Sequence, residues 1–259
     1  RTFKEYFESC MNCILSAEDI IMNYNFDKFE QKLLQLHLSM TDLMKNQFSQ
    51  YYDLMCEWNK VMNLTAITEF DEVIEKHFLD SVALGAFIDL KHEKRIIDIG
   101  TGAGFPGIPL KIMFPELDIL LVDSLKKRIV FLNEVIQKLE ISNICAVHGR
   151  AEDFAHKKDY REKYNFCVSR AVAHLSCLSE YCIPFVKQGG MFVAYKSAEI
   201  TEELTQSERA IEILGGKLSK VEKFQLPDTE YGRSFVFIEK VNHTLKTYPR
   251  KAGTPVRCP

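Results

Sequence analysis

An aspartate and three alternating glycines, Asp98, Gly100, Gly102 and Gly104, follow an apolar run and precede a proline, Pro106. Glycines in such a row let the backbone adopt positive φ and let a ligand approach without a Cβ in the way. The amphipathic stretch after them indicates a helix, whose first N–H groups and positive dipole end attract an anionic group. The spacing therefore predicts a cofactor site over this turn.

Two kinds of cofactor fit the turn. Gly102, Gly104 and Gly107 match the dinucleotide fingerprint G-x-G-x-x-G, which binds a pyrophosphate. Asp98 would repel a pyrophosphate and attract the ammonium of an aminoacyl group, and Pro106 removes an N–H group that a pyrophosphate site needs. The sequence thus favours S-adenosylmethionine over a nicotinamide or a flavin, and a purely structural glycine turn remains an alternative.

Charged side chains also follow three later apolar runs, namely Asp123, Glu152 and Arg170. Because ligands of open α/β sheets bind beyond the carboxyl ends of the strands, we expect these side chains to surround the same site. Asp123 can accept both hydroxyls of a ribose, Glu152 can read the edge of an adenine, and Arg170 can pair with a carboxylate or clamp a phosphate. Helix-terminal acids and a surface salt bridge are the alternative interpretations.

No obvious general base follows the fourth apolar run. Ser169-Arg170-Ala171 stands where many amino-methylating enzymes of this kind carry an Asn-Pro-Pro-Tyr type tetrapeptide and DNA cytosine methyltransferases carry Pro-Cys. Methylation of an amine, a carbon or a hydroxyl usually requires removal of a proton, whereas N7 of guanine offers a lone pair. Positioning would then supply most of the catalysis. The sequence permits guanine N7 as the acceptor and does not establish it.

Short apolar runs alternate with helical stretches from residue 95 onward. Strands are expected at 95–99, 118–122, 144–148, 164–168 and 190–195, with helices near 106–113, 125–139, 152–157 and 174–186. This alternation predicts a parallel sheet with helices on both faces. The helix at 125–139 has the clearest apolar face, with Leu125 on that face and Ser124 as its cap.

The end of the chain has a different pattern. A helix near 199–214 precedes two successive strands, near 217–224 and 234–240, with no helix between them. Two such strands indicate an antiparallel last strand. The expected fold class is therefore α/β, a Rossmann-like sheet of the class I S-adenosylmethionine-dependent methyltransferases, mostly parallel with its last strand antiparallel.

The first part of the chain is helical in pattern. Apolar residues recur at three- and four-residue steps through residues 33–58, and Ser39 or Thr41 could cap a helix there. We therefore expect a helical N-terminal extension and cap at 1–69 and the methyltransferase domain, with a basic tail, at 70–259.

A net charge of −3 and a pI near 6.2 argue against a strongly basic nucleic-acid binder. The last nineteen residues differ from the rest, since they contain Lys246, Arg250, Lys251 and Arg257 and no acid. A local basic patch can bind phosphate even when the whole chain is not basic. A solvated tail is the alternative interpretation.

The eight cysteines fit a reducing cytoplasm. Cys10 and Cys13 form a lone C-x-x-C without a second ligand pair, so we expect no metal. No apolar run approaches the ~20 residues of a membrane helix, and the first thirty residues lack the pattern of a signal peptide. We expect a cytoplasmic monomer without a membrane partner.

Seven motifs in order resemble one family, the bacterial small-subunit ribosomal RNA guanine-N7 methyltransferases, also called glucose-inhibited division protein B. The motifs are Trp58-Asn59, Asn63-Leu64-Thr65, His77-Phe78-Leu79-Asp80-Ser81, the run from Asp98 to Gly107, Arg150-Ala151-Glu152, Ser169-Arg170-Ala171 and the tail from Tyr248 to Pro255. The resemblance covers roughly residues 40 to 259, which makes it far more specific than any single motif.

This resemblance implies a reaction and a set of cofactor contacts. The reaction is methyl transfer to N7 of one guanine in 16S rRNA of the small ribosomal subunit, and Arg170 is the expected catalytic residue, through positioning. Cofactor contacts are implied at Gly100, Phe105, Ala151, Glu152 and Arg170, with Asp123 added by the fold and Asp98, Gly102 and Gly104 by the glycine turn.

Contacts with RNA are expected at six positions. They are Tyr248, Arg250 and Lys251 in the tail, Lys196 after the fifth strand, and Asn63 and His77 in the early motifs. The target guanine must be unpaired or splayed out to reach the methyl group. For Asn63 a helix C-cap, and for His77 a structural histidine, are the alternatives.

Three other functions stay open at the level of sequence. A methyltransferase acting on a small molecule or a protein would show an acceptor KM that does not depend on salt, because phosphate contacts make affinity salt-dependent. A non-catalytic regulator would bind S-adenosylmethionine or a nucleotide without turnover. A nicotinamide dehydrogenase is the weakest alternative, since no Tyr-Lys or His-Asp pairing for hydride transfer is visible.

Overall fold

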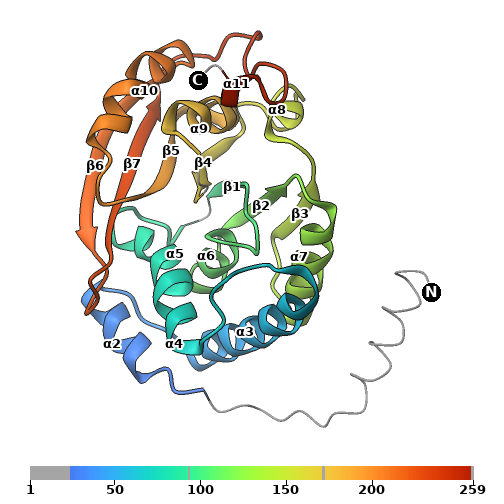
Figure 1. Cartoon of the computed structure of the whole chain (residues 1–259), viewed down its shortest axis with the longest axis vertical. Helices are drawn as coiled ribbons and strands as arrows, with labels where there is room; N and C mark the ends of the chain where they lie inside the picture. The colour runs from blue at the N-terminus through green and yellow to red at the C-terminus, as the bar shows by residue number, and fades with distance from the viewer. Residues whose placement is uncertain (1–23, 93, 171–172, 258–259) are drawn as a thin grey trace, which may run out of the picture.

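The computed structural model describes residues 24–92, 94–170 and 173–257, and seven strands form one sheet in the order β3-β2-β1-β4-β5-β7-β6 (Figure 1). The strands are β1 (Arg95–Ile99), β2 (Asp118–Asp123), β3 (Ile144–His148), β4 (Tyr164–Ser169), β5 (Val186–Ser197), β6 (Gly216–Gln225) and β7 (Gly232–Lys240). Strands β1 to β5 run parallel, and β7 is antiparallel to both β5 and β6. The expected α/β fold with an antiparallel last strand is confirmed.

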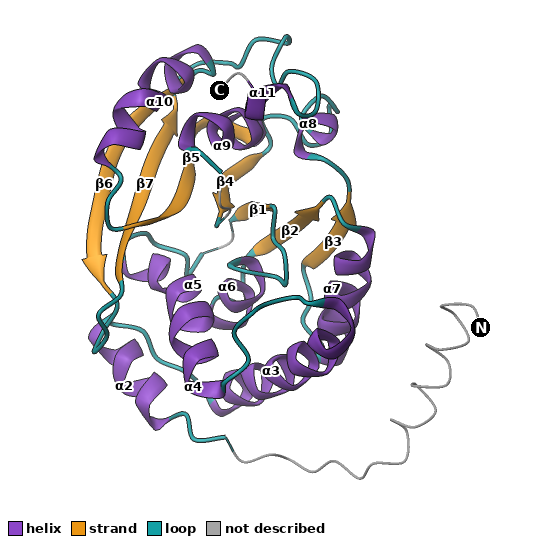
Figure 2. Ribbon diagram, viewed as in Figure 1, coloured by secondary structure: helices purple, strands orange, loops and turns teal. Residues whose placement is uncertain are grey.

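Helices cover both faces of the sheet (Figure 2). They are α2 (Asp27–Gln35), α3 (Asp42–Met62), α4 (Phe70–Val73), α5 (Asp80–Val82), α6 (Gly107–Met113), α7 (Lys126–Lys138), α8 (Ala151–Phe154), α9 (Leu175–Cys182), α10 (Thr201–Ile213) and α11 (Thr254–Arg257), with a π-helix at Ile74–Leu79 and 3-10 turns at Ala83–Ala86 and Ile183–Phe185. Side chains alternate across a strand, so Ile96 belongs to the core cluster that includes residues of α2, α3, α6 and α7, and Ile97 to the cluster that includes residues of α8, α9 and α10.

The helices before residue 69 pack into the same core as one face of the sheet. Phe48, Tyr51 and Met55 of α3 are fully buried there. The Tyr51 hydroxyl donates a hydrogen bond to the carbonyl of Ala103, and Trp58 packs against Phe131 of α7 at a ring-centroid distance of 5.9 Å. The described part of the N-terminal segment therefore contacts the glycine turn directly. A domain boundary at residue 69 stays a prediction.

Of the two predicted helix caps, one is confirmed and the other prediction is wrong. Thr41 caps α3 as expected, since its Oγ1 accepts from the N–H of Met44 at 3.3 Å. The expected cap of α7, Ser124, makes no capping bond, because the helix begins one residue later and Leu125 holds the N-cap position. The N–H of Leu125 donates instead to Asp123 Oδ1 at 2.8 Å. Leu125 is 42% exposed and so does not belong to the apolar face.

Strand β5 begins four residues earlier than the apolar pattern indicates. Residues 187–189, near the start of the strand, are exposed and not apolar, so the apolar pattern does not indicate that they belong to a strand. The helix expected at 174–186 is shorter, because it ends at Cys182 and a 3-10 turn at Ile183–Phe185 leads into β5. Cys10, Cys13 and Ala171 lie outside the described residues.

Neither a membrane span nor a metal cluster is found in the described ranges. No helix within 24–92, 94–170 and 173–257 is long and apolar enough to cross a membrane. In the same ranges, no group of three or more His, Cys, Asp or Glu side chains could hold a metal ion.

Candidate functional site

A cavity of about 1030 Å³ opens at the carboxyl ends of β1, β4 and β5, the edge where open α/β sheets bind ligands. Its volume lies at the upper end of the range for small-molecule sites. The residues that line it come from seven parts of the chain and include Leu64, Thr65, Ile67, Lys76, His77, Asp80, the glycine turn at 100–103, Phe105, Arg128, Arg170, Lys196, Tyr231 and Arg233.

The glycine turn has the backbone that the sequence predicts, since φ is +73° at Gly100, +63° at Gly102 and +101° at Gly104. A Cβ at Gly104 would lie 2.6 Å from Cδ1 of Ile108 and 2.7 Å from the hydroxyl of Tyr51, so packing also requires a glycine here. A Cβ at Gly102 would meet no atom within 4 Å. Gly102 therefore leaves an open surface of backbone at the cavity.

Asp98 holds the turn from below and does not line the cavity. Its Oδ2 accepts from the hydroxyl of Thr101 at 2.7 Å and from the N–H of Gly107 at 2.9 Å. Its Oδ1 is buried and has no hydrogen-bond partner among the described residues. Burial raises the pKa of this carboxyl to about 7. A direct contact between Asp98 and an aminoacyl ammonium stays a prediction.

Asp123 is bound from three sides by the protein itself. Its Oδ1 accepts from the N–H of Leu125, and its Oδ2 accepts from the N–H of Gly102 at 2.9 Å and from Nη1 of Arg128 at 3.1 Å. This carboxylate thereby ties β2 to the glycine turn. Arg128, which the sequence analysis missed, lines the cavity beside it, so a ribose at Asp123 must share the carboxylate with this arginine.

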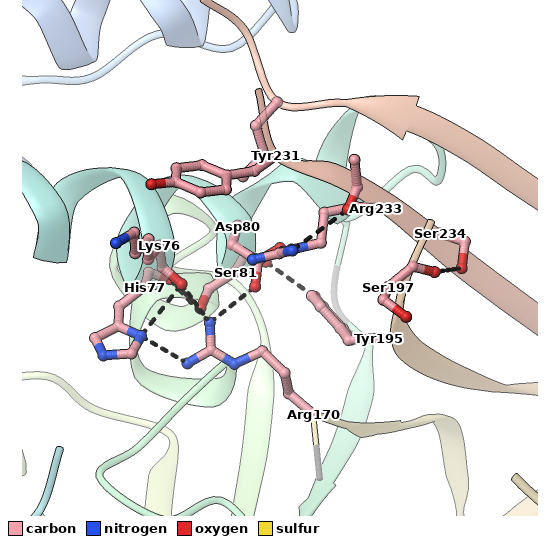
Figure 3. Close-up of polar contacts among 12 residues, drawn as sticks. Lys76, His77, Asp80, Ser81, Arg170, Tyr195, Ser197, Tyr231, Arg233 and Ser234 are labelled. Carbon is pink, nitrogen blue, oxygen red and sulfur yellow. Dashed lines mark hydrogen bonds and ion pairs between the residues drawn. The ribbon is translucent and has the colours of Figure 1, made fainter. Parts of the chain in front are cut away.

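Arg170 lies at the centre of a polar cluster (Figure 3). Its Nη1 donates to the carbonyl of Lys76 at 3.1 Å and to Asp80 Oδ2 at 3.0 Å, and its Nη2 is 3.3 Å from His77 Nδ1. Its guanidinium carbon lies 4.9 Å from the ring centroid of Phe105. These contacts fix the guanidinium where the end of β4 meets the glycine turn.

His77 stacks on the same phenylalanine. The two ring centroids are 4.6 Å apart with an interplanar angle of 21°. Burial and the nearby charge of Arg170 lower the pKa of His77 to about 4, so its imidazole is neutral at physiological pH. Its Nε2 lies 2.9 Å from the hydroxyl of Thr65. His77 therefore lines the cavity as a neutral, hydrogen-bonded ring and not as a cation.

Asp80 is a central member of the site that was not singled out from the sequence. Its buried carboxylate accepts from Arg170 through one oxygen and from Nε of Arg233, at 2.8 Å, through the other. The only sequence feature that pointed to it is its place in the His77–Ser81 motif. It joins the end of β4 to the start of β7.

Cations outnumber carboxylates on the cavity wall. Among the lining residues that the structure describes there are five cations and two carboxylates. The cations are Lys76, Arg128, Arg170, Lys196 and Arg233, and the carboxylates are Asp80 and Glu203. Lys196, one of the expected RNA contacts, donates to Glu203 Oε1 at 2.6 Å and to the carbonyl of Ala173 at 2.7 Å. The wall suits a polyanion or a phosphate group.

Besides Asp98, Gly104, Asp123, Asn63 and Lys251, four of the sequence-predicted site residues do not line this cavity. Ala151 and Glu152 begin α8, after β3, and neither lines it. Tyr248 and Arg250 line a neighbouring cavity of about 580 Å³ between α9, α10 and the tail, and the two cavities share His174.

The tail is anchored by an ion pair to a buried carboxylate and by hydrogen bonds from Arg161 to its backbone carbonyls. Arg250 binds Glu180 through its backbone N–H at 2.6 Å and through Nε and Nη2 of its guanidinium. Arg161 donates to the carbonyls of Thr244, Leu245 and Tyr248. The Arg250 guanidinium, expected to contact RNA, thus holds the tail against α9 in this structure. Lys251, the next residue, is exposed.

Asn63 adopts the alternative role that the sequence allowed. It is the C-cap of α3, with φ of +49°, and its N–H donates to the carbonyl of Asn59 at 3.3 Å. Asparagine tolerates this left-handed backbone better than most residues. Its side chain is not among those that line the cavity.

Comparisons with known proteins agree with the sequence motifs. A family model described as rRNA small subunit methyltransferase G (GidB) matches residues 44–231. A protein of Lachnoclostridium phytofermentans named ribosomal RNA small subunit methyltransferase G is 54% identical, over 89% of this chain and 96% of its own length. One of the same name from Desulforamulus reducens is 52% identical, over 84% and 92%.

Similarity to solved structures concerns the fold alone. The structure of M. jannaschii TYW2 in complex with AdoMet superposes with a TM-score of 0.51 at 14% identity, covering 68% of this chain and 80% of that one. At this identity the match supports the Rossmann-like sheet and says nothing of the acceptor.

Proposed function

Since this chain belongs to the rRNA small subunit methyltransferase G family, we propose that it transfers a methyl group from S-adenosylmethionine to N7 of a guanine in 16S rRNA. One observation carries this proposal. The open glycine turn and a wall rich in cations belong to the same cavity, so a cofactor and a nucleotide of RNA can meet there.

The residues on the glycine-turn side suit S-adenosylmethionine. Gly100 and Gly102 offer bare backbone, and the buried Oδ1 of Asp98 below them lacks a partner among the described residues. Phe105 and Arg170 would bind the amino-acid part, and Asp123, Ala151 and Glu152 the adenosine. When bound, the cofactor supplies an electrophilic methyl group.

The other residues of the cavity suit an acceptor that needs no general base. His77 is neutral and already hydrogen-bonded, and Asp80 is shared by two arginines. Guanine N7 brings its own lone pair, so alignment of N7 with the methyl group is the main requirement. Arg170 is the positioning residue for that alignment, because it contacts the Phe105 ring and the buried Asp80.

RNA contacts are proposed at the residues that the sequence indicated, with different support. Lys196 lines the cavity, and Lys251 and Tyr248 lie on the tail beside the neighbouring cavity. His77 and Arg250 already hydrogen-bond within the protein, so we propose that they act by positioning the groups around them. Asn63 is exposed, and it is proposed as a contact at the end of α3. The protein is proposed to act as a cytoplasmic monomer without a metal.

The test is transfer of a labelled methyl group from S-adenosylmethionine to small ribosomal subunits from cells that lack this gene, followed by mass spectrometry of the nucleosides. Label in 7-methylguanosine from one site of 16S rRNA is the expected result. Label in another nucleoside or in a protein would replace the proposed acceptor. Binding of S-adenosylmethionine with no transfer would favour a regulator.

Arg170→Ala should abolish this transfer and leave the fold intact. Arg95→Ala is the matched control, because Arg95 is an exposed arginine at the opposite end of β1. If Arg170→Ala shows normal turnover and normal cofactor affinity, Arg170 has no role in catalysis or in cofactor binding.

A further inference from the structure

Tyr231 lines the larger cavity, on a wall that is not formed by the parallel strands. It belongs to the loop between β6 and β7, and its backbone is fixed on both sides. Its N–H donates to Oγ1 of Thr229 at 3.1 Å, and its carbonyl accepts from the N–H of Leu226 at 3.0 Å. Its side chain is partly exposed. The loop thus holds an aromatic ring at a fixed place in the cavity.

Two cations make cation–π contacts with this ring. Nζ of Lys76 is 5.2 Å from the ring centroid, and the guanidinium carbon of Arg233 is 6.0 Å from it. In the view of Figure 3, the ring and the guanidinium of Arg170 lie on opposite sides of Asp80. Within the described part of the chain, no second aromatic ring packs against Tyr231.

The charge of each cation is balanced by a carboxylate of its own. Lys76 pairs with Glu72, and Arg233 pairs with Asp80. The ring is therefore bordered by ion pairs whose remaining N–H groups can still donate. Such a border can bind a phosphate without repelling a cationic base over the ring.

From this arrangement we infer that Tyr231 is the stacking platform for the acceptor guanine, and that Lys76 and Arg233 bind the phosphates next to it. This inference rests on the proposed function and adds the place of the base within the cavity. An aromatic ring flanked by cations is a common means of holding an unstacked base of RNA. The glycine turn is then left to the cofactor.

The reaction gives the tyrosine a second role. The lone pair of N7 forms the new bond to the methyl carbon, and the electrons of the broken carbon–sulfur bond stay on sulfur. The positive charge thus moves from the sulfonium to the purine. The face of a tyrosine ring carries partial negative charge and attracts a cation, so it favours the developing charge over the neutral base. Tyr231 should therefore affect kcat as well as KM.

The test compares Tyr231→Ala and Tyr231→Phe with the wild type. The control is Tyr160→Ala, because Tyr160 is also half-exposed and packs on Phe154 outside the cavity. For each protein we would measure kcat and KM with small subunits, the Kd for S-adenosylmethionine by calorimetry, the Kd for small subunits, and Tm.

Tyr231→Ala should lower kcat/KM for small subunits by about tenfold or more, with both terms affected, while Kd for S-adenosylmethionine stays within about twofold. Tyr231→Phe should retain most of the wild-type activity, because the ring face remains. Tyr160→Ala should match the wild type. Unchanged kcat/KM in Tyr231→Ala, or an equal loss of cofactor affinity, would overturn the inference.

Failure of the proposed function gives a different result. If the wild-type protein binds small subunits but transfers no methyl group to guanine N7, the proposed reaction is refuted. In that case a weaker Kd of Tyr231→Ala for small subunits still supports a base stacked on the ring, and an unchanged Kd removes that contact too.

Discussion

Removal of the Asp80 carboxylate should destabilise the protein and the site together. Asp80 is 3% exposed and binds Nη1 of Arg170 at 3.0 Å and Nε of Arg233 at 2.8 Å. A hydrogen bond to a charged group contributes about 1.5–3 kcal/mol, and removing one partner of a buried ion pair costs about 3–5 kcal/mol. Since water can still reach the two arginines, we expect Asp80→Ala to lower the free energy of unfolding by about 3 kcal/mol.

The measurement is chemical denaturation followed by the fluorescence of Trp58, the single tryptophan, whose ring packs against α7. Asp159→Ala serves as the control because Asp159 is exposed, and such a change usually stays within about 0.5 kcal/mol. Asp80→Asn, which keeps the size and one acceptor oxygen, should fall between the two. If Asp80→Ala is no less stable than Asp159→Ala, the carboxylate does not hold the two arginines as argued here.

Three further predictions concern the turn and the tail. Burial raises the pKa of Asp98 to about 7, so between pH 4 and 7 the folded protein keeps a proton that the unfolded chain releases. The ligand-free wild type should thus lose up to about 4 kcal/mol of stability relative to Asp98→Asn as pH rises through this window, and a difference independent of pH would contradict this. Gly104→Ala brings a Cβ within 2.6 Å of a neighbouring side chain and should lower Tm more than Gly102→Ala, for which positive φ alone costs about 1 kcal/mol; equal shifts in Tm would refute the packing argument. Glu180→Ala removes the carboxylate that Arg250 binds, so limited proteolysis should cut the tail faster while cofactor affinity stays unchanged, and an unaltered cleavage rate would show that other contacts hold the tail.

The sequence predicts best what depends on neighbours in the chain. Strands β1, β2 and β4 match their apolar runs closely because they lie inside the sheet and most of their residues are buried. The glycine turn is predictable because positive φ leaves few alternatives to glycine. The cap of α7 is wrong for a local reason as well. The helix begins at Lys126, so Ser124 precedes the N-cap position, and Asp123 Oδ1 accepts the N–H of the N-cap residue Leu125.

Partners far apart in the chain are the part that the sequence could not indicate. Asp80 and Arg233 are 153 residues apart, and Glu180 and Arg250 are 70 apart. No periodicity links such positions, since the contact exists only after β7 inserts between β5 and β6 and the tail folds over α9. An arginine in a basic tail looks like a phosphate contact until its carboxylate partner is located.

The geometry at Arg170 depends on segments that precede the sheet. Its guanidinium is held by the carbonyl of Lys76 and by Asp80, both from the helical segment before β1. The glycine turn is supported in the same way, because the hydroxyl of Tyr51 binds the carbonyl of Ala103. The parallel sheet therefore supplies the strand ends, and the preceding helices set the distance between the turn and the arginine. This division of roles explains why the motifs at 58–81 accompany the glycine motif, although they lie outside the Rossmann-like strands.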